Sequence, residues 1–382
     1  MTPTARPHPE LRLHREPFGT APDGGPVERW TFGAAGGVTA AVLTYGGILQ
    51  SCRVPDRDGR TADVVLALPT TAAYAADDTY LGALVGRYAN RIAGAAFTLD
   101  GTTHRLPDND RGNTLHGGPD GFHRRIWTAD PVTADDRVGV RLRLRSPDGD
   151  MGFPGRLDVE VAYTVDRAGT LAVDYRAVGD RPTVVNLTQH AYWNLAGGGD
   201  VAGHRLTVDA DAYLPVGPTG IPHGGAPAPV AGTPFALTGR PLADVFRAAA
   251  TDPQLAAAGG LDHCYALPGG TTARPRRAAV LDDPASGRRL ETWTTEPGLQ
   301  VYTANGLGTR FGRHAAVCLE TQRFPDTPNR PDYPSAVLLP RQIHRSTTHY
   351  RFTHIAPTNT ATGSPTPLSS SGAAAPDLRR TP

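Results

Sequence analysis

The chain of 382 residues contains no lysine, and all 38 of its basic residues are arginine. The absence of lysine excludes Schiff-base chemistry, which needs a lysine amine. It also excludes a P-loop, in which a lysine contacts the nucleotide phosphates. The arginine excess by itself indicates nothing about a ligand. Alanine, glycine and proline are abundant too, a combination typical of a GC-rich genome.

Cysteine is also scarce, and Cys52, Cys264 and Cys318 lie far apart in the chain. The absence of a CxxC pair excludes a zinc ribbon and a dithiol redox motif. A sparse, odd set of cysteines suits a reducing compartment, so we expect a cytoplasmic protein. The N-terminal residues carry no apolar run typical of a signal peptide, and no stretch is long enough to cross a bilayer. We therefore expect no membrane partner.

Neither sign of charge dominates, because the formal net charge is +1 at pH 7. This balance argues against nucleic acid as a partner, since nucleic-acid binders present a strong positive field. The 44 glycines and 36 prolines make 80 of 382 residues, or about 21%, which is below the roughly 25–30% typical of disordered chains. A hydrophobic fraction of 39% is sufficient for a packed core.

Alternation of apolar and polar residues with a period of two is the main structural signal. It is clearest over 157–165, 171–178 and 138–144. This period is typical of half-buried antiparallel strands. The residues DRAG at 166–169 separate two of these runs as a hairpin turn does. Further strands are predicted over 38–45, 62–67, 205–209, 288–294, 299–304, 315–321 and 349–355.

Helical patterns are few and short. They are expected within 71–84, 241–250 and 252–257. Because none of them alternates with strands in a βαβ rhythm, a parallel doubly wound sheet is not expected. We predict an all-β fold, a large and mainly antiparallel β-sandwich with a few short helices.

One domain accounts for most of the chain. We expect a flexible N-terminus over 1–19 and a single β-sandwich domain over 20–356. The tail over 357–382 is rich in Ser, Thr, Pro, Gly and Ala and has little to bury, so we expect it to be disordered.

One acidic residue interrupts an apolar strand pattern. In the run VCLETQ, Val317 and Leu319 share one face, and Cys318 and Glu320 share the other. A lone Glu in a strand is commonly on a solvated face. Here the neighbouring Cys318 and Gln322 favour a lined cavity, in which the surroundings can tune a carboxylate into a general base.

His190 lies in the run NLTQHAYWNL, where polar and apolar side chains alternate. As a strand, this run would put His190 on one face with Thr188 and Tyr192. Aromatic rings beside polar groups suit a sugar, whose CH face stacks while its hydroxyls need partners. A buried structural histidine bonded to a backbone carbonyl fits the same run equally well.

Other polar clusters are weaker signals when taken alone. His116 precedes two glycines, which permit a close backbone approach or a positive φ. Asn90 and Arg91 could bind hydroxyls, or Arg91 could pair with a carboxylate in the core. Asp262 next to His263 could form a metal pair, but no HExxH or His-x-His spacing is present, so we expect no metal.

Taken together and in order, several segments resemble the aldose 1-epimerase (galactose mutarotase) family. They are GGILQSCRVPDRDGRTADVVLAL at 46–68, YLGALVGRYANRI at 80–92, NTLHGGPDGFHRRIW at 113–127, NLTQHAYWNLAG at 186–197, LDHCYAL at 261–267, LQVYTANGL at 299–307 and CLETQRFPDTPN at 318–329. The resemblance runs from about residue 20 to 355. It implies a large antiparallel β-sandwich and an isomerase that interconverts α and β anomers of hexoses such as glucose and galactose. It also implies no metal and no organic cofactor.

The resemblance implies roles for individual residues. Glu320 matches the catalytic base and His190 the proton donor, and His116 matches the first active-site histidine. The family's sugar-binding positions are matched by Asn90, Arg91, His116, Asp262 and Gln300. A carboxylate and an imidazolium in one cavity are expected to favour each other's charged forms. The expected partner is a small aldose, bound by a monomer or weak homodimer.

The chain departs from the family pattern at Gln189, Ala191 and His344, which leaves the preferred aldose open. None of these departures removes a catalytic side chain. A non-catalytic sugar-binding relative would be expected to lack Glu320 or His190, and both are present.

Two other reactions stay open at this point. An epimerase of a phosphorylated hexose should add an arginine cluster for the phosphate, and Arg124, Arg125 and Arg323 are candidates. A glycoside hydrolase would use Asp262 and Glu320 as its acid and base.

Overall fold

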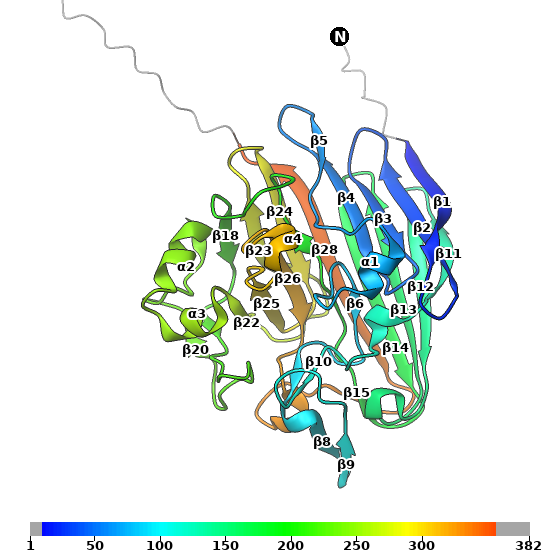
Figure 1. The fold of residues 1–382 in the computed structure, drawn as a ribbon, viewed down its shortest axis with the longest axis vertical. Coiled ribbons are helices and arrows are strands. Elements are labelled where there is room, and N and C mark those ends of the chain that lie inside the picture. Colours follow the sequence, from blue (N-terminus) through cyan, green and yellow to red (C-terminus); the bar gives the residue numbers. More distant parts are fainter. Residues whose placement is uncertain (1–9, 357–382) are drawn as a thin grey trace, which may run out of the picture.

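A computed structural model describes residues 10–356 of the chain, and most of its strands belong to three antiparallel sheets (Figure 1). The five-stranded sheet consists of β1 (Leu11–Thr20), β2 (Pro26–Ala34), β3 (Thr39–Leu43), β4 (Leu49–Pro55) and β5 (Thr61–Asp63). The nine-stranded sheet has the order β11 (Thr128–Thr133), β12 (Arg137–Ser146), β13 (Leu157–Asp166), β14 (Thr170–Gly179), β28 (Ile343–His354), β24 (Arg288–Thr294), β23 (Arg276–Asp282), β18 (Arg205–Val208) and β21 (Thr238–Pro241). The six-stranded sheet has the order β17 (Tyr192–Trp193), β26 (Val317–Gln322), β25 (Gly298–Tyr302), β22 (Asp262–Ala266), β19 (Ala212–Tyr213) and β20 (Ala228–Pro229).

Smaller elements connect these sheets. The two-stranded pairs are β7 (Arg91–Ile92) with β10 (Thr114–Leu115), β6 (Leu84–Val85) with β16 (Thr188–Gln189), β15 (Thr183–Val184) with β27 (Val337–Leu338), and β8 (Ala96–Leu99) with β9 (Thr102–Arg105). The α-helices are α1 (Thr71–Ala75), α2 (Leu242–Ala248), α3 (Pro253–Ala258) and α4 (Gly308–Phe311). The 3-10 helices are η1 (Ala93–Ala95), η2 (Phe122–Arg124), η3 (Asp150–Gly152) and η4 (Thr327–Asn329).

The nine-stranded sheet forms one layer of the sandwich, and the other two sheets pack against it. Strand β2 contacts β12 and β13, and Figure 1 shows the blue strands over the green ones at this end. At the other end, the rings of Trp193 and Tyr350 lie 4.8 Å apart between β17 and β28. The hydroxyls of Thr321 and Thr348 are 2.5 Å apart between β26 and β28. One continuous apolar core therefore underlies both smaller sheets.

The predicted alternation decides which face of the longest strands is buried. Leu157, Val159 and Val161 of β13 are buried, as the period-two pattern predicts. The hairpin between β13 and β14 turns at Gly169, whose φ of 84° suits glycine, while the Asp166 carboxylate accepts a hydrogen bond from the amide of Thr170 at 2.8 Å. The prediction of an all-β fold with a few short helices is confirmed.

Helices α1 and α2 lie within the predicted ranges 71–84 and 241–250, and α3 overlaps 252–257, whereas α4 was not predicted. Thr70 caps α1 by accepting from the amide of Ala73, and Asp252 caps α3 by accepting from the amide of Leu255. Helix α3 ends at Gly259, whose φ of 72° is left-handed. No helix within residues 10–356 combines the length and apolarity that a bilayer crossing requires.

The predicted flexible N-terminus is wrong in its second half. Residues 11–20 form β1, which pairs with β2 from Leu11 opposite Ala34 to Thr20 opposite Pro26. Leu11 and Leu13 pack against the main core, so this strand buries apolar side chains. The charged residues between and after them masked this pattern in the sequence. Residues 1–9, and the tail over 357–382 for which disorder was predicted, lie outside the described residues.

The fully buried Leu142 of β12 tests this core. We expect Leu142→Ala to lower the free energy of unfolding by roughly 2–5 kcal/mol, because it removes apolar contacts and leaves a cavity. Arg143→Ala, next to it on the solvent-facing side of β12, should leave the stability close to that of the wild type, since its ion pairs are exposed. Urea unfolding of both variants measures the difference. Equal losses would contradict this assignment of faces.

Candidate active site

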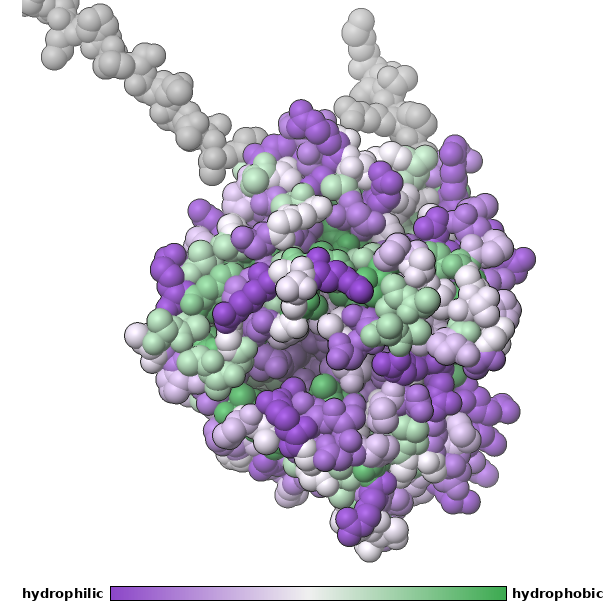
Figure 2. Space-filling view, viewed as in Figure 1, coloured by the Kyte–Doolittle hydropathy of each residue, from purple (hydrophilic) through white to green (hydrophobic). Residues whose placement is uncertain are grey.

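A cavity of about 280 Å³ opens on the surface beside the six-stranded sheet. Figure 2 shows a hollow near the middle of this face. All the site residues predicted from the sequence line it, namely Asn90, Arg91, His116, His190, Asp262, Gln300 and Glu320. They come from segments that are far apart in the chain. The cavity volume lies just below the range typical of ligand sites, about 300–1,000 Å³, and therefore suits a small ligand.

Three neighbouring strands supply one wall of the cavity. Gln300 of β25 lies directly opposite Glu320 of β26, and β22 on the other side of β25 carries Asp262. The amide nitrogen Nε2 of Gln300 donates to Oδ1 of Asp262 at 2.7 Å. Strand alternation turns Val317 into the main core and Glu320 into the cavity, as the sequence predicted. Sheet register therefore fixes these polar groups side by side.

His190 reaches the cavity from a bend, which the sequence did not predict. The run 186–195 is broken into the short strands β16 and β17, and His190 lies between them. Its amide donates to the carbonyl of Ala83 at 2.9 Å, and its carbonyl accepts from Gly82 at 3.0 Å. Gln189 secures the bend, because its side chain donates to the carbonyl of Gly82 and accepts from the amide of Ala191.

The side chains of His190 and Glu320 meet in the cavity. Nε2 of His190 is 3.7 Å from Oε1 of Glu320, and both side chains are at most 5% exposed. Nδ1 of His190 lies 3.6 Å from the sulfur of Cys318. Oε2 of Glu320 and Oε1 of Gln300 are buried and have no partner among the described residues. These oxygens can therefore accept hydrogen bonds from a bound ligand.

His116 and Asn90 hold each other in position. The amide of Asn90 donates to Nδ1 of His116 at 3.1 Å, and the amide of His116 donates to the carbonyl of Asn90 at 3.1 Å. Both residues have a positive φ, 62° for Asn90 and 53° for His116, a conformation that costs energy outside glycine. Because Nδ1 accepts, the neutral imidazole of His116 carries its proton on Nε2 and offers a donor.

This tautomer bears on whether the site suits a metal. Ligand atoms of His116, His190 and Glu320 lie within 4.8 Å of one another, a set that zinc can use in other proteins. A metal bound to Nε2 of His116 would require the ring proton to move to Nδ1. Nδ1–H would then face the N–H of Asn90, and two donors cannot form a hydrogen bond with each other. The arrangement is therefore better suited to hydrogen bonding and proton transfer than to metal binding.

Burial changes the protonation of the central pair. Burial, reinforced by the charge of Asp262, raises the pKa of Glu320 well above its ordinary value. Burial lowers the pKa of His190 to about 4. The expectation that each group mainly favours the charged form of the other is therefore corrected, because the loss of hydration outweighs their attraction. Arg91 still lowers the pKa of Glu320, and Asp262 still raises that of His190.

The aromatic part of the site was not predicted from the sequence. The ring of Tyr80 lies 4.6 Å from that of His116 and 6.1 Å from that of His190, and it is buried enough to raise its pKa to about 12. The other lining residues that were not predicted are Asp78, Thr79, Leu115, Tyr192, Tyr302 and Gly306. Tyr80 is the first residue of the segment 80–92, and Tyr192 lies two residues after His190. The sequence therefore contained a signal for both residues.

Comparisons with known proteins identify relatives over nearly the whole chain. The family model described as aldose 1-epimerase matches residues 28–351. The galactose mutarotase of Rattus norvegicus is 39% identical over 353 residues, covering 90% of this chain and 99% of the relative. The aldose 1-epimerase of Escherichia coli (strain K12) is 37% identical over 342 residues, covering 87% of this chain and 97% of the relative.

A solved structure has a similar fold. The galactose 1-epimerase from Lactobacillus acidophilus NCFM superimposes with a TM-score of 0.79 at 29% identity. The match covers 90% of this chain and 99% of that chain. The sandwich and the segments that surround the cavity therefore belong to one shared architecture.

The lowered pKa values of four buried histidines should make the free energy of unfolding depend on pH. Burial lowers the pKa of His190 and His263 to about 4, and that of His123 and His344 to about 3. The unfolded chain binds these protons near pH 6.5. Their contribution to stability is therefore present above about pH 6.5 and is lost as the pH falls towards 4, at about 1.4 kcal/mol per pH unit for each proton.

Urea unfolding between about pH 7 and about pH 5 measures this slope. The raised pKa of Glu320 acts in the opposite direction, but the histidines outnumber it. We expect His344→Tyr to reduce the slope by about one proton, because it removes one of these groups. An unchanged slope in this variant would contradict the interpretation.

Proposed function

The chain belongs to the aldose 1-epimerase family of isomerases, and we propose that it interconverts the α and β anomers of hexoses such as glucose and galactose. The observation that carries the proposal is the pairing of His190 with Glu320, 3.7 Å apart in a cavity of monosaccharide size. Anomerisation needs one acid and one base at a single hemiacetal, with no nucleophile and no electron carrier.

The reaction opens the ring and closes it again. The carboxylate of Glu320 takes the proton of the C1 hydroxyl, and protonated His190 gives its proton to the ring oxygen. The bond between C1 and the ring oxygen breaks, and the C1 aldehyde forms. Rotation about the C1–C2 bond presents the other face of the carbonyl. Closure runs the same steps backwards and gives the other anomer.

The pKa directions at the pair favour one of its two protonation states. The mechanism needs carboxylate and imidazolium with the ring closed, and protonated Glu320 with neutral His190 with the ring open. Burial favours the neutral state, and the charge of Asp262 adds to this at Glu320. Arg91 supports the carboxylate of Glu320, and Asp262 supports the imidazolium of His190, from which opening starts.

The remaining side chains are suited to hold the sugar. Nε2–H of His116 is a donor for a hydroxyl or for a developing oxyanion. Arg91 offers a charged donor, and the Asp262–Gln300 pair offers oxygens that accept from hydroxyls. Tyr80, Tyr192 and Tyr302 add aromatic surface for the CH face of a pyranose.

The phosphorylated-hexose alternative is less favoured by the positions of its arginines. Arg124 donates to the carbonyls of Ala75 and Asp77, and Arg125 pairs with Asp150. Arg323 lines a different cavity. Arg91 is therefore the cavity's guanidinium among the described residues, and a phosphate would lack the arginine cluster that it needs.

The hydrolase alternative uses a poorer acid than the one the cavity offers. Asp262 accepts a hydrogen bond from Gln300, whereas His190 already faces Glu320. We propose a cytoplasmic location, because the three cysteines are buried and unpaired. We also propose that the enzyme is a monomer or weak homodimer. A free aldose is the proposed partner.

The base assignment is tested by Glu320→Gln. We expect anomerisation to fall at least about 100-fold, because the amide cannot take the C1 proton, while the sugar still binds. Polarimetry on fresh α-glucose and α-galactose measures the rate, and calorimetry measures binding. Glu160→Gln on the outer sheet face is the matched control and should keep full activity. Near-normal activity in Glu320→Gln would reject the assignment, and release of reducing ends from a glycoside would favour a hydrolase.

The acid assignment is tested by His190→Asn. The substituted amide is far too weak an acid to protonate the ring oxygen, so we expect a loss of about 10²–10⁴-fold in the same polarimetric assay. A loss of less than about tenfold would argue against His190 as the acid.

A further inference from the structure

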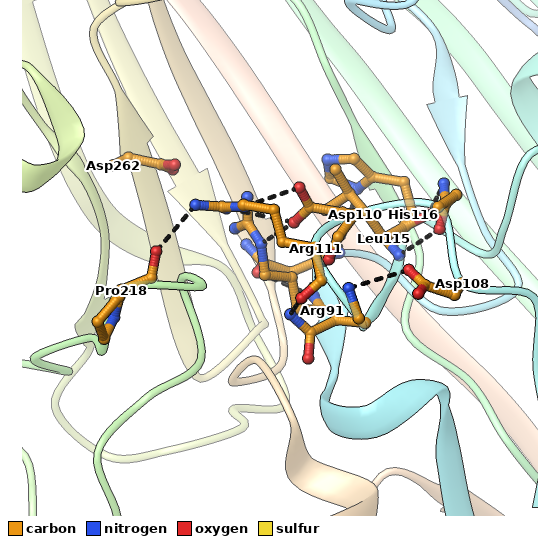
Figure 3. Close-up of polar contacts among 12 residues, drawn as sticks. Arg91, Asp108, Asp110, Arg111, Leu115, His116, Pro218 and Asp262 are labelled. Atoms are coloured by element: carbon orange, nitrogen blue, oxygen red, sulfur yellow. Dashed lines mark hydrogen bonds and ion pairs between the residues drawn. The ribbon is translucent and has the colours of Figure 1, made fainter.

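Two loops meet next to Arg91 at the edge of the cavity. One is the loop 107–113, which precedes β10, and the other is the segment 215–222, which follows β19. Figure 3 shows the side chains of Arg91 and Arg111 gathered around the carboxylate of Asp110, with Pro218 on the opposite side of Arg111. None of these contacts is used in the acid–base steps.

Asp110 binds both arginines. Nε of Arg91 donates to Oδ2 of Asp110 at 2.6 Å. Nε and Nη2 of Arg111 donate to Oδ1 and Oδ2 of the same carboxylate at 3.1 and 3.3 Å. The Arg91 and Asp110 side chains are 10% and 17% exposed, whereas that of Arg111 is 51% exposed. The pair formed with Arg91 is therefore the one shielded from solvent, where a charged hydrogen bond is strongest.

This contact determines what Arg91 can offer to a ligand. A guanidinium is a rigid, planar fork, so holding Nε fixes the plane and the direction of the other two nitrogens. Neither Nη1 nor Nη2 of Arg91 has a hydrogen-bond acceptor among residues 10–356. Both are therefore available to the oxygens of a ligand in the cavity that Arg91 lines.

The segment 215–222 covers the same guanidinium. A Cβ at Gly220 would lie 2.9 Å from both Cζ and Nε of Arg91, and Gly220 has a φ of 78°. The backbone therefore approaches closely only because this residue is glycine. Arg111 ties the segment in place, since its Nη1 donates to the carbonyl of Pro218 at 3.0 Å. Asp110 is thus connected to the segment through Arg111 and to the ligand donor through Arg91.

We propose that Asp110 is a positioning residue that orients Arg91 towards the sugar hydroxyls, and that Arg111 fastens the segment 215–222 to the same carboxylate. The Asp110 carboxylate then fixes the orientation of Arg91 and, through Arg111, the position of the segment 215–222 that covers Arg91. This inference rests on the proposed anomerisation. Arg91 would hold sugar hydroxyls in both the ground state and the transition state, so its misplacement weakens binding in both. Because Arg91 also supports the charge of Glu320, a smaller fall in kcat is expected as well.

The test compares Asp110→Asn with Asp108→Asn. Both variants remove one negative charge from the same loop, but Asp108 is exposed and accepts from the amide of Gly112 rather than from Arg91. We expect Asp110→Asn to raise the KM for galactose about tenfold or more, with a smaller fall in kcat, since a charged hydrogen bond that positions Arg91 is lost. Asp108→Asn should keep both constants. Asp110→Glu should restore part of the affinity, because it returns the charge.

The outcomes separate this inference from the proposed function. If the wild-type chain does not anomerise sugars, the proposed function fails. If the wild type is active but Asp110→Asn and Asp108→Asn have the same KM, or if only kcat falls, Asp110 does not position Arg91. Should Asp110→Asn not fold, Asp110→Glu replaces it, and a KM equal to that of the wild type then overturns the positioning role. Arg111→Ala tests the tie separately, because it cuts the bond to Pro218 and leaves the Arg91 contact intact. A KM raised about two- to fivefold supports the tie, and an unchanged KM overturns it.

Discussion

The burial of a carboxyl group beside an imidazole is the constraint on which the site depends. Glu320 and His190 are almost fully shielded from water, so neither can hold its charge without support from the protein. The surrounding groups supply part of that support, because Arg91 lowers the pKa of Glu320 and Asp262 raises that of His190. The tautomer of the neighbouring His116 is set by the amide of Asn90.

Two kinds of scaffold bring these groups together. Glu320 and Asp262 lie on paired strands of the six-stranded sheet, where register fixes their spacing. Asn90, His116 and His190 come from bends whose backbones bond to one another or to neighbouring segments. The positive φ values of Asn90 and His116 indicate strain, which the mutual hydrogen bonds offset. Strand register therefore fixes the spacing of Glu320 and Asp262, and the bends bring Asn90, His116 and His190 to the same cavity from outside the sheet.

The sequence predicts the parts that depend on local patterns. Alternation gave the long strands β13, β14 and β24 and the cavity-facing side of Glu320. It did not give the pairing of β14 with β28, because nothing local specifies a partner so distant in the chain. The alternation over 186–195 also predicts one continuous strand. In the structure this run is divided into β16 and β17, where the Gln189 side chain donates to the carbonyl of Gly82. Asp110 was missed because its role appears only when Arg91 is beside it.

The absence of lysine has a consequence at the cavity. A lysine near Glu320 could lose its proton when buried, whereas arginine keeps its charge under all ordinary conditions. Asp110 holds Nε of Arg91, so in the proposed reaction the positive charge would stay in place while a proton passes between the sugar and Glu320 or His190. The total number of protons in the pair is the same at each end of ring opening. In the proposed reaction the fixed charges therefore do not need to rearrange, so it requires no movement of the sandwich.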